Sequence, residues 1–205
     1  MPGSPTYRIR PAACFDLFTP WYDVGCAVLG YGRGFKEWVA AWGRVAPGHR
    51  VLDVGAGTGV LDRVLLEGPA PPTTLALDPD RRALQIARRK APRPLVGIAA
   101  RGEAMPFADR TFDRVFSTLA LHHVPDRWRG GVFREIRRVL RPDGRFVCAD
   151  FENHRRRWVP RRFASDRTLE EWIAAAGFRI EERARRRGVH LFVLSLPPPV
   201  RGVDR

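Results

Sequence analysis

Short apolar runs alternate with longer amphipathic segments along most of the chain. Apolar runs of strand length occupy residues 50–54, 73–77, 95–99, 112–118 and 145–149. Segments with helical spacing occupy residues 60–66, 80–90, 128–140 and 168–176, and Asp80 is placed to cap the second of them. Such alternation is typical of parallel strands joined by crossover helices. The pattern therefore predicts a doubly wound α/β fold, with helices on both faces of a mostly parallel sheet.

Two further strand-like runs, 178–183 and 189–196, are separated by a turn at Gly188. A short turn joins neighbouring antiparallel strands, so we expect a seven-stranded, Rossmann-like sheet with an antiparallel C-terminal end. The sequence Pro-Asp-Gly at 142–144 is expected to stop the preceding helix. Residues 197–205 begin with three prolines, and we predict a disordered tail there.

An aromatic-rich segment precedes the first strand. It contains Phe15, Phe18, Trp21, Tyr22, Tyr31, Phe35, Trp38 and Trp42. Residues 36–45 have helical spacing, and packing in the core is the expected role of most of these rings. We therefore divide the chain into an N-terminal helical lid segment, 1–46, an α/β domain, 47–196, and the tail.

Length and composition limit the class of protein. A chain of 205 residues with 44% hydrophobic residues predicts one domain with a packed core. No run approaches the roughly 18 apolar residues of a membrane span, and no secretory signal is recognisable. The cysteines, Cys14, Cys26 and Cys148, form no CxxC pair, so we expect neither a metal site nor a disulfide framework. The expected location is the cytoplasm.

The formal net charge of +14 raises nucleic acid or an anionic membrane surface as partners. Only Lys36 and Lys90 are lysines, and such an arginine excess is also expected from a GC-rich genome. Residues 155–162, Arg-Arg-Arg-Trp-Val-Pro-Arg-Arg, interleave arginine with an aromatic ring. This segment is compatible with RNA binding, with peripheral contact to anionic lipid, or with an ordinary solvated face, which we favour.

The most informative stretch is the glycine-rich turn after the first strand, VLDVGAGTG at 51–59. A dinucleotide fingerprint needs a glycine where Val60 stands, and the Gly-Lys-Ser/Thr ending of a phosphate-binding P-loop is absent. A nucleoside cofactor without pyrophosphate fits better. Asp78, at the end of the second strand, is placed to accept hydrogen bonds from ribose hydroxyls.

Four stretches, in order, carry a resemblance to a known family. They are VLDVGAGTG at 51–59, LALD at 75–78, GEAMPF at 102–107 followed by Phe112-Asp113, and LRPDGR at 140–145. The spacing of Phe15-Asp16 and Tyr22-Asp23 also matches. The sequence resembles the class I S-adenosylmethionine-dependent methyltransferases, in particular their ubiquinone/menaquinone C-methyltransferase branch. The resemblance covers roughly residues 15–150 and makes 47–196 the methyltransferase domain.

The resemblance implies a cofactor, S-adenosyl-L-methionine, and residues that bind it. The implied set is Asp53, Gly55, Ala56, Gly57 and Thr58 at the amino-acid end, Asp78 and Pro79 at the ribose, Arg101 and Gly102 at the adenine, Thr118 beside the sulfonium, and Tyr22 as a cap. The sequence departs from the family at Arg101, the position at which an Asp or Asn usually contacts adenine. Arg101 has no acceptor for the adenine amino group, so either a backbone carbonyl takes that role or Arg101 stacks on the adenine ring.

Methyl transfer to carbon or oxygen needs a base when the acceptor still carries its proton. His122 and His123 follow the fourth strand and are the candidate bases, and in an extended chain only one of them would face the site. The favoured function is methyl transfer to a small acceptor that is aromatic or lipophilic and quinone-like. The alternatives are an RNA methyltransferase that uses residues 155–162 and a non-catalytic S-adenosylmethionine-binding module. The sequence leaves the oligomeric state open.

Overall fold

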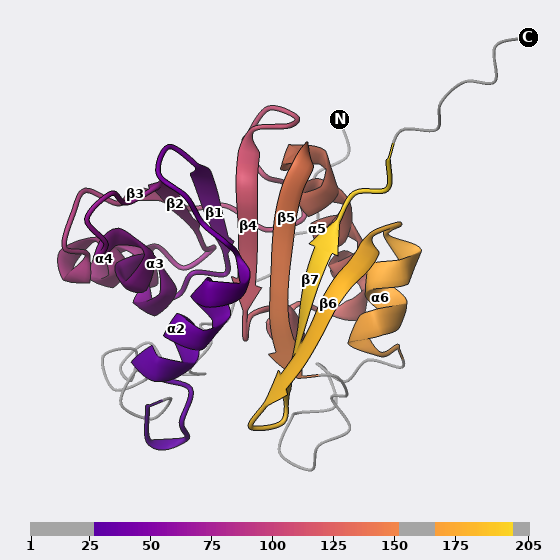
Figure 1. Cartoon of the computed structure of the whole chain (residues 1–205), viewed down its shortest axis with the longest axis horizontal. Helices are drawn as coiled ribbons and strands as arrows, with labels where there is room; N and C mark the ends of the chain where they lie inside the picture. The colour runs from indigo at the N-terminus through magenta and orange to yellow at the C-terminus, as the bar shows by residue number, and fades with distance from the viewer. Residues whose placement is uncertain (1–26, 152–166, 199–205) are drawn as a thin grey trace, which may run out of the picture.

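The computed structural model describes residues 27–151 and 167–198 (Figure 1). Its helices and strands are α2 (Arg33–Trp42), β1 (Arg50–Val54), α3 (Val60–Leu66), β2 (Thr73–Leu77), α4 (Arg81–Lys90), β3 (Val96–Ile98), β4 (Phe112–Thr118), the 3₁₀ turn η1 (Leu121–His123), α5 (Asp126–Val139), β5 (Leu140–Phe151), α6 (Leu169–Ala175), β6 (Arg179–Arg186) and β7 (Val189–Ser195).

The strands form one seven-stranded sheet in the order β3-β2-β1-β4-β5-β7-β6. β1 pairs in parallel with β2 and β4, β2 with β3, and β4 with β5. β7 lies antiparallel to both β5 and β6. The predicted Rossmann-like sheet with an antiparallel C-terminal end is therefore confirmed.

Apolar side chains alternate between the two faces of the sheet. Along β5, Phe146 and Cys148 pack into one core cluster, whereas Val147 and Ala149 pack into the other. α5 and α6 cover the first cluster, while α2 and α3 cover the second, and α2 crosses in front of the sheet in Figure 1. Burial on both faces explains why the central strands are rich in apolar residues at successive positions, such as Val51-Leu52, Val115-Phe116 and Phe146–Ala149.

Side-chain chemistry sets several helix ends. Asp80 caps α4 as predicted, because its carboxylate accepts hydrogen bonds from the backbone N–H groups of Arg82, at 2.8 Å, and Ala83, at 3.3 Å. Thr168 and Glu171 form a reciprocal capping box at the start of α6. The helix predicted over 36–45 is α2, displaced three residues toward the N-terminus.

The structure corrects the prediction around residues 142–144. α5 ends at Val139, three residues before Pro142, and β5 begins at Leu140 rather than at residue 145. Leu140 is fully buried and pairs with Phe112 of β4, so the chain enters the sheet directly. The register then shifts, which accommodates the Pro-Asp-Gly sequence within the strand.

Several predictions fall on residues outside the described ranges. These are the lid residues 1–26 with Tyr22, the basic segment 155–162, Cys14 and Cys26, and the tail from residue 199. The division into a lid segment, a domain and a tail stays a prediction. No helix within 27–151 and 167–198 is long and apolar enough to cross a membrane.

Candidate functional site

A pocket of about 220 Å³ opens at the carboxyl ends of the parallel strands. This edge is where ligands bind in open α/β sheets. The predicted site residues that line it are Gly55, Ala56, Gly57, Thr58, Asp78, Pro79, Arg101, Gly102, Thr118 and His123. Asp53 and His122 do not line it. The topology thus brings together residues from the loops after β1, β2, β3 and β4.

The glycine loop after β1 shapes one wall of the pocket. Gly55 has a φ of +76°, and its N–H donates to the Leu77 carbonyl at 2.8 Å. A Cβ at Gly55 would stand 2.3 Å from the Ala120 Cβ. A Cβ at Gly57, with a φ of +55°, would meet nothing within 4 Å. Gly55 is therefore required for packing, whereas Gly57 leaves open space on the ligand side.

Asp78 joins the ends of β1 and β2. One carboxylate oxygen accepts from the Gly57 N–H at 2.9 Å, and the other accepts from the Asp80 N–H at 2.8 Å. Burial raises the pKa of Asp78 above its usual value, and these two backbone donors partly oppose that rise. The side chain thus fixes the glycine loop and also faces the pocket.

The adenine end of the predicted site has an acceptor that sequence reasoning missed. The Arg101 guanidinium lies 3.8 Å from the Glu103 carboxylate, and both side chains line the pocket. A guanidinium only donates hydrogen bonds, whereas a carboxylate accepts them. Glu103 is therefore a hydrogen-bond acceptor on the pocket wall beside Arg101, and the sequence analysis did not single it out.

Two pocket-lining residues carry buried hydroxyl groups that have no protein partner. In the described part of the chain, the buried hydroxyls of Ser117 and Thr118 have no hydrogen-bond partner, and both residues line the pocket. Lys36 also lines it, and its Nζ donates to the Thr118 carbonyl at 3.4 Å. Buried polar groups normally find partners, so these two hydroxyls are exceptions among the described residues.

The two histidines are not equivalent. They lie on the 3₁₀ turn η1 rather than on extended chain, and only His123 lines the pocket. His122 Nδ1 lies 2.7 Å from an oxygen of Asp150, which is 1% exposed. The two imidazole rings are 3.9 Å apart at an angle of 44°. Asp150 therefore holds His122, and the ring of His122 packs on that of His123.

A pair of carboxyl groups lies buried beneath the glycine loop. Asp53 is 2% exposed and Asp62 is fully buried, and neither Asp62 oxygen has a hydrogen-bond partner on another described residue. Burial raises the pKa of Asp53 to about 7, although the charge of Lys36 opposes the rise. The pKa of Asp62 is raised by burial and then by Asp53. Asp62 thus favours its protonated form.

Replacing Asp62 with alanine is expected to stabilise the fold by about 1–3 kcal/mol near pH 8, because it removes a buried, unpartnered carboxyl group. Because the pKa of Asp62 is higher in the folded chain than in the unfolded chain, folded Asp62 keeps its proton at pH values where unfolded Asp62 has lost it. Wild-type stability therefore falls as pH rises above the unfolded value of 3.8. The gain from Asp62→Ala should grow with pH in urea unfolding at pH 5 and pH 8.

The exposed Asp143 provides the matched control, because Asp143→Ala removes a carboxyl group that water already solvates. Its stability difference from wild type should be small at both pH values. A gain for Asp62→Ala that is equal at pH 5 and pH 8 would contradict the raised pKa.

Comparisons with known proteins agree with this geometry. A family model described as a methyltransferase domain matches residues 52–148. The demethylmenaquinone methyltransferase of Renibacterium salmoninarum is 37% identical over 146 residues, covering 69% of this chain and 59% of that protein. The ubiquinone/menaquinone biosynthesis C-methyltransferase UbiE of Geotalea uraniireducens is 32% identical over 150 residues, covering 69% and 63%. The chain contains a class I S-adenosylmethionine-dependent methyltransferase domain.

Solved structures show the same fold. The methyltransferase chain of a Haloferax volcanii complex with the Trm112 methyltransferase activator matches with a TM-score of 0.75 at 22% identity. The match covers 93% of this chain and 100% of that chain. This chain spans 59–63% of the length of the two curated methyltransferases above.

The pocket of this methyltransferase domain fits S-adenosylmethionine, the cofactor that the family implies. A Cβ at Gly57 would meet no protein atom within 4 Å, and the pocket-lining residues Asp78 and Glu103 carry carboxylates that would accept hydrogen bonds from a nucleoside. Ser117 and Thr118, whose buried hydroxyls have no protein partner, also line the pocket. Within the described ranges, no group of three or more His, Cys, Asp or Glu side chains is arranged to hold a metal ion.

Proposed function

We propose that the protein is an S-adenosylmethionine-dependent methyltransferase, EC 2.1.1.-, that methylates a small, lipophilic, quinone-like acceptor. The observation that carries the proposal is one pocket that combines the cofactor-loop residues with His123 and an apolar wall. The names of the curated relatives, which refer to demethylmenaquinone and to ubiquinone/menaquinone biosynthesis, support the acceptor class.

The acceptor side of the pocket is largely apolar. The residues that give it this character are Tyr31, Leu119, Leu121, Val124, Pro125 and Trp128. Tyr31 also packs edge-on against Phe35 and Phe151, at ring-centroid distances of 5.4 and 5.8 Å, which fixes its ring. An aromatic or aliphatic acceptor would bury apolar surface here, whereas a charged acceptor would lose its hydration.

S-adenosylmethionine, when bound, supplies an electrophilic methyl group on its sulfonium. An acceptor carbon or oxygen that still carries a proton would have to lose that proton as it receives the methyl group. His123 is the pocket residue suited to take the proton. The chain otherwise contributes orientation and exclusion of water.

Mass spectrometry tests the proposal. A cell extract is incubated with the protein and with S-adenosylmethionine that carries an isotopically labelled methyl group. Label on a quinol or a related lipophilic phenol is the expected result. Label confined to RNA would overturn the acceptor class. If no fraction contains a labelled product although the cofactor binds, the proposed activity is overturned.

Replacing His123 with glutamine is expected to lower turnover by about 100-fold while cofactor affinity stays unchanged, because the pocket loses its base. The matched control is His122→Asn, whose amide keeps a donor toward Asp150; its turnover should stay within about tenfold of wild type. Steady-state kinetics with the identified acceptor and calorimetry with the cofactor provide the two readouts. Full activity of His123→Gln would remove His123 from the base role.

A further inference from the structure

A pair of aliphatic side chains is exposed just before α2. Val28 is 82% exposed and Leu29 is 67% exposed. Among the described residues, the remaining large apolar side chain with comparable exposure is Val96, on the edge strand β3. These two adjacent side chains form a small apolar patch, and covering it with a partner would be favourable.

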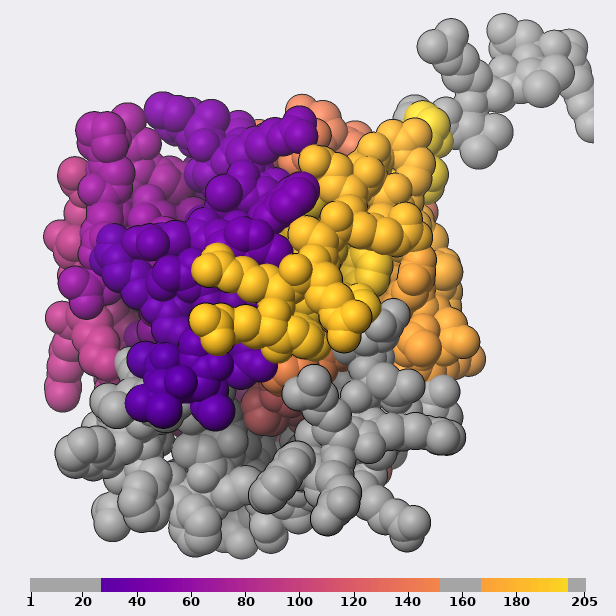
Figure 2. Space-filling model, turned by 60° about the horizontal axis from the view of Figure 1, so that its bottom comes forward, coloured from indigo at the N-terminus to yellow at the C-terminus, as the bar shows by residue number. Residues whose placement is uncertain are grey.

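The tip of the β6–β7 hairpin lies beside this pair. Arg185, Arg186 and Arg187 are exposed, and none of the three belongs to an ion pair within the described part of the chain. Figure 2 shows the yellow hairpin lying against the indigo segment that leads into α2. The hairpin tip that carries these three arginines, together with Val28 and Leu29, is called the hairpin surface below.

Several contacts fix the hairpin to the segment before α2. The Tyr31 hydroxyl donates to the Arg187 carbonyl at 3.0 Å. An Arg186 nitrogen donates to the Gly34 carbonyl at 3.4 Å, and its guanidinium lies 5.8 Å from the Trp38 ring. A Cβ at Gly30 would stand 2.8 Å from the Arg187 guanidinium, so the arginine packs closely over this glycine. Arg186 and Arg187 therefore lie against the segment that leads into α2. Arg185, one position earlier in β6, lies on the opposite face of the sheet at the same hairpin tip.

The hairpin surface adjoins the mouth of the pocket. Tyr31 and Gly32, which line the pocket, follow Leu29 directly in the chain. Val189, the first residue after the hairpin turn, pairs with Phe151 at the carboxyl end of β5. A partner that covers the hairpin surface would thus stand where an acceptor enters the pocket.

We propose that the hairpin surface docks the protein on an anionic lipid bilayer, with Val28 and Leu29 inserted among the acyl chains and Arg185, Arg186 and Arg187 at the lipid phosphates. Exposed aliphatic side chains flanked by arginines are suited to this interface. Binding of single-stranded RNA uses exposed aromatic rings for base stacking. Here Tyr31 packs against Phe35 and Phe151, and Arg186 covers Trp38, so the surface favours lipid.

The test measures binding of the full chain to vesicles by co-sedimentation. Wild type should bind vesicles of phosphatidylcholine mixed with phosphatidylglycerol, and should bind pure phosphatidylcholine far more weakly. The triple variant Arg185→Gln, Arg186→Gln, Arg187→Gln should lose roughly 100-fold in affinity, about fivefold for each arginine. Leu29→Ser should lose about tenfold in vesicle affinity, although its charge is the same as that of the wild type.

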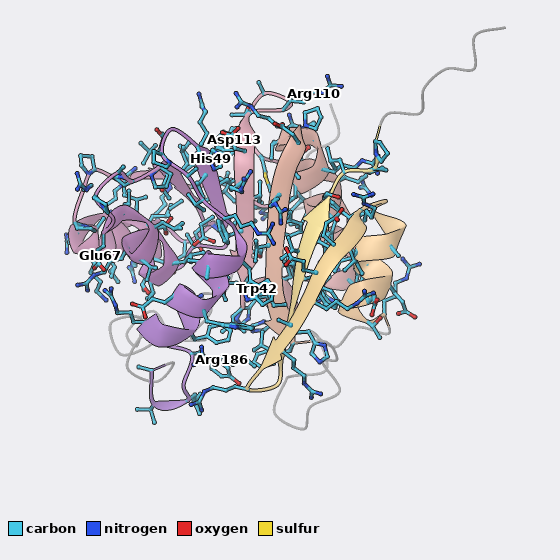
Figure 3. The ribbon with its side chains drawn as sticks, in the orientation of Figure 1. Trp42, His49, Glu67, Arg110, Asp113 and Arg186 are labelled. Carbon is cyan, nitrogen blue, oxygen red and sulfur yellow. The ribbon has the colours of Figure 1, made fainter. Side chains whose placement is uncertain are left out.

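The matched control removes the same charge from other exposed arginines, Arg89→Gln, Arg110→Gln and Arg134→Gln, and should bind almost as well as wild type. Arg110 and Arg186 lie at opposite ends of the molecule in Figure 3. Equal loss in the two triple variants would overturn the proposal, since net charge alone would then explain binding. Absence of vesicle binding, or RNA binding that depends on these arginines while vesicles do not bind, would also overturn it.

This proposal does not depend on the acceptor. Calorimetry should give wild-type affinity for S-adenosylmethionine in the hairpin variant, because none of the three arginines lines the pocket. If vesicles bind as expected but no lipophilic product is labelled, the proposed function fails and the docking surface stands. If a lipophilic product is labelled but the hairpin variants bind vesicles as well as the wild type does, the docking proposal alone fails.

Discussion

Gly55→Ala is expected to destabilise the fold by about 3 kcal/mol, because a methyl group there overpacks the loop and the backbone is left-handed. The new Cβ would stand 2.3 Å from the Ala120 Cβ, and the φ of +76° disfavours any side chain. For a chain of this size, the melting temperature should fall by roughly 6–12 °C. Thermal unfolding followed by circular dichroism measures the change.

Gly57→Ala provides the comparison within the same loop. Its φ is also positive, at +55°, but a Cβ there meets no protein atom within 4 Å. Its stability should therefore fall by only about 1 kcal/mol. The cost should appear instead in calorimetry with S-adenosylmethionine, because the added methyl group occupies the ligand side of the pocket. Equal destabilisation by both substitutions would contradict the distinct roles of the two glycines.

Asp78→Ala is expected to weaken binding of S-adenosylmethionine by roughly 10–100-fold, through loss of charge-assisted hydrogen bonds. The substitution acts twice. It removes the carboxylate that faces the pocket, and it releases the Gly57 N–H that this carboxylate holds at 2.9 Å. Isothermal titration calorimetry measures the affinity directly and needs no acceptor.

Two controls separate these effects. Asp78→Asn keeps one oxygen that can accept from the Gly57 N–H, so it should retain more affinity than Asp78→Ala. Asp143→Ala removes an exposed carboxyl group from the 142–144 turn within β5 and should leave affinity unchanged. Unchanged affinity in Asp78→Ala would refute the assignment of this carboxylate to the cofactor.

Periodicity and motif spacing were sufficient for most of the fold. The sheet needs apolar residues on both faces, so β1, β2 and β4 were visible as short segments rich in apolar residues, with the predicted bounds. The start of β5 was predicted wrongly, at residue 145 instead of residue 140. Pro142 and Gly144 usually interrupt a helix or strand, but here the burial of Leu140 draws the chain into the sheet before them. Tertiary packing overrode the local signal there.

The pocket was predictable where it depends on the order of the chain. Parallel strands place their carboxyl ends at one edge, and this alone brings Gly57, Asp78 and Thr118 together. The difference between His122 and His123 was not predictable, because it depends on Asp150 from another strand and on a 3₁₀ turn that carries no sequence signal. The burial of Asp62 was hidden for a related reason, since a carboxyl group on a predicted helix is ordinarily assigned to the solvent side.

The strand order β5-β7-β6 has a consequence for how the protein is made. The last described strand, β7, is an inner strand, so the edge of β5 lacks its neighbour until residues 189–195 have been synthesised. An unpaired apolar strand edge is a template for pairing with other chains. Chains that are still on the ribosome, or that end prematurely, carry this unpaired edge although their glycine loop is complete. We expect these chains to aggregate most readily. Pairing of β7 with β5 removes the exposed edge.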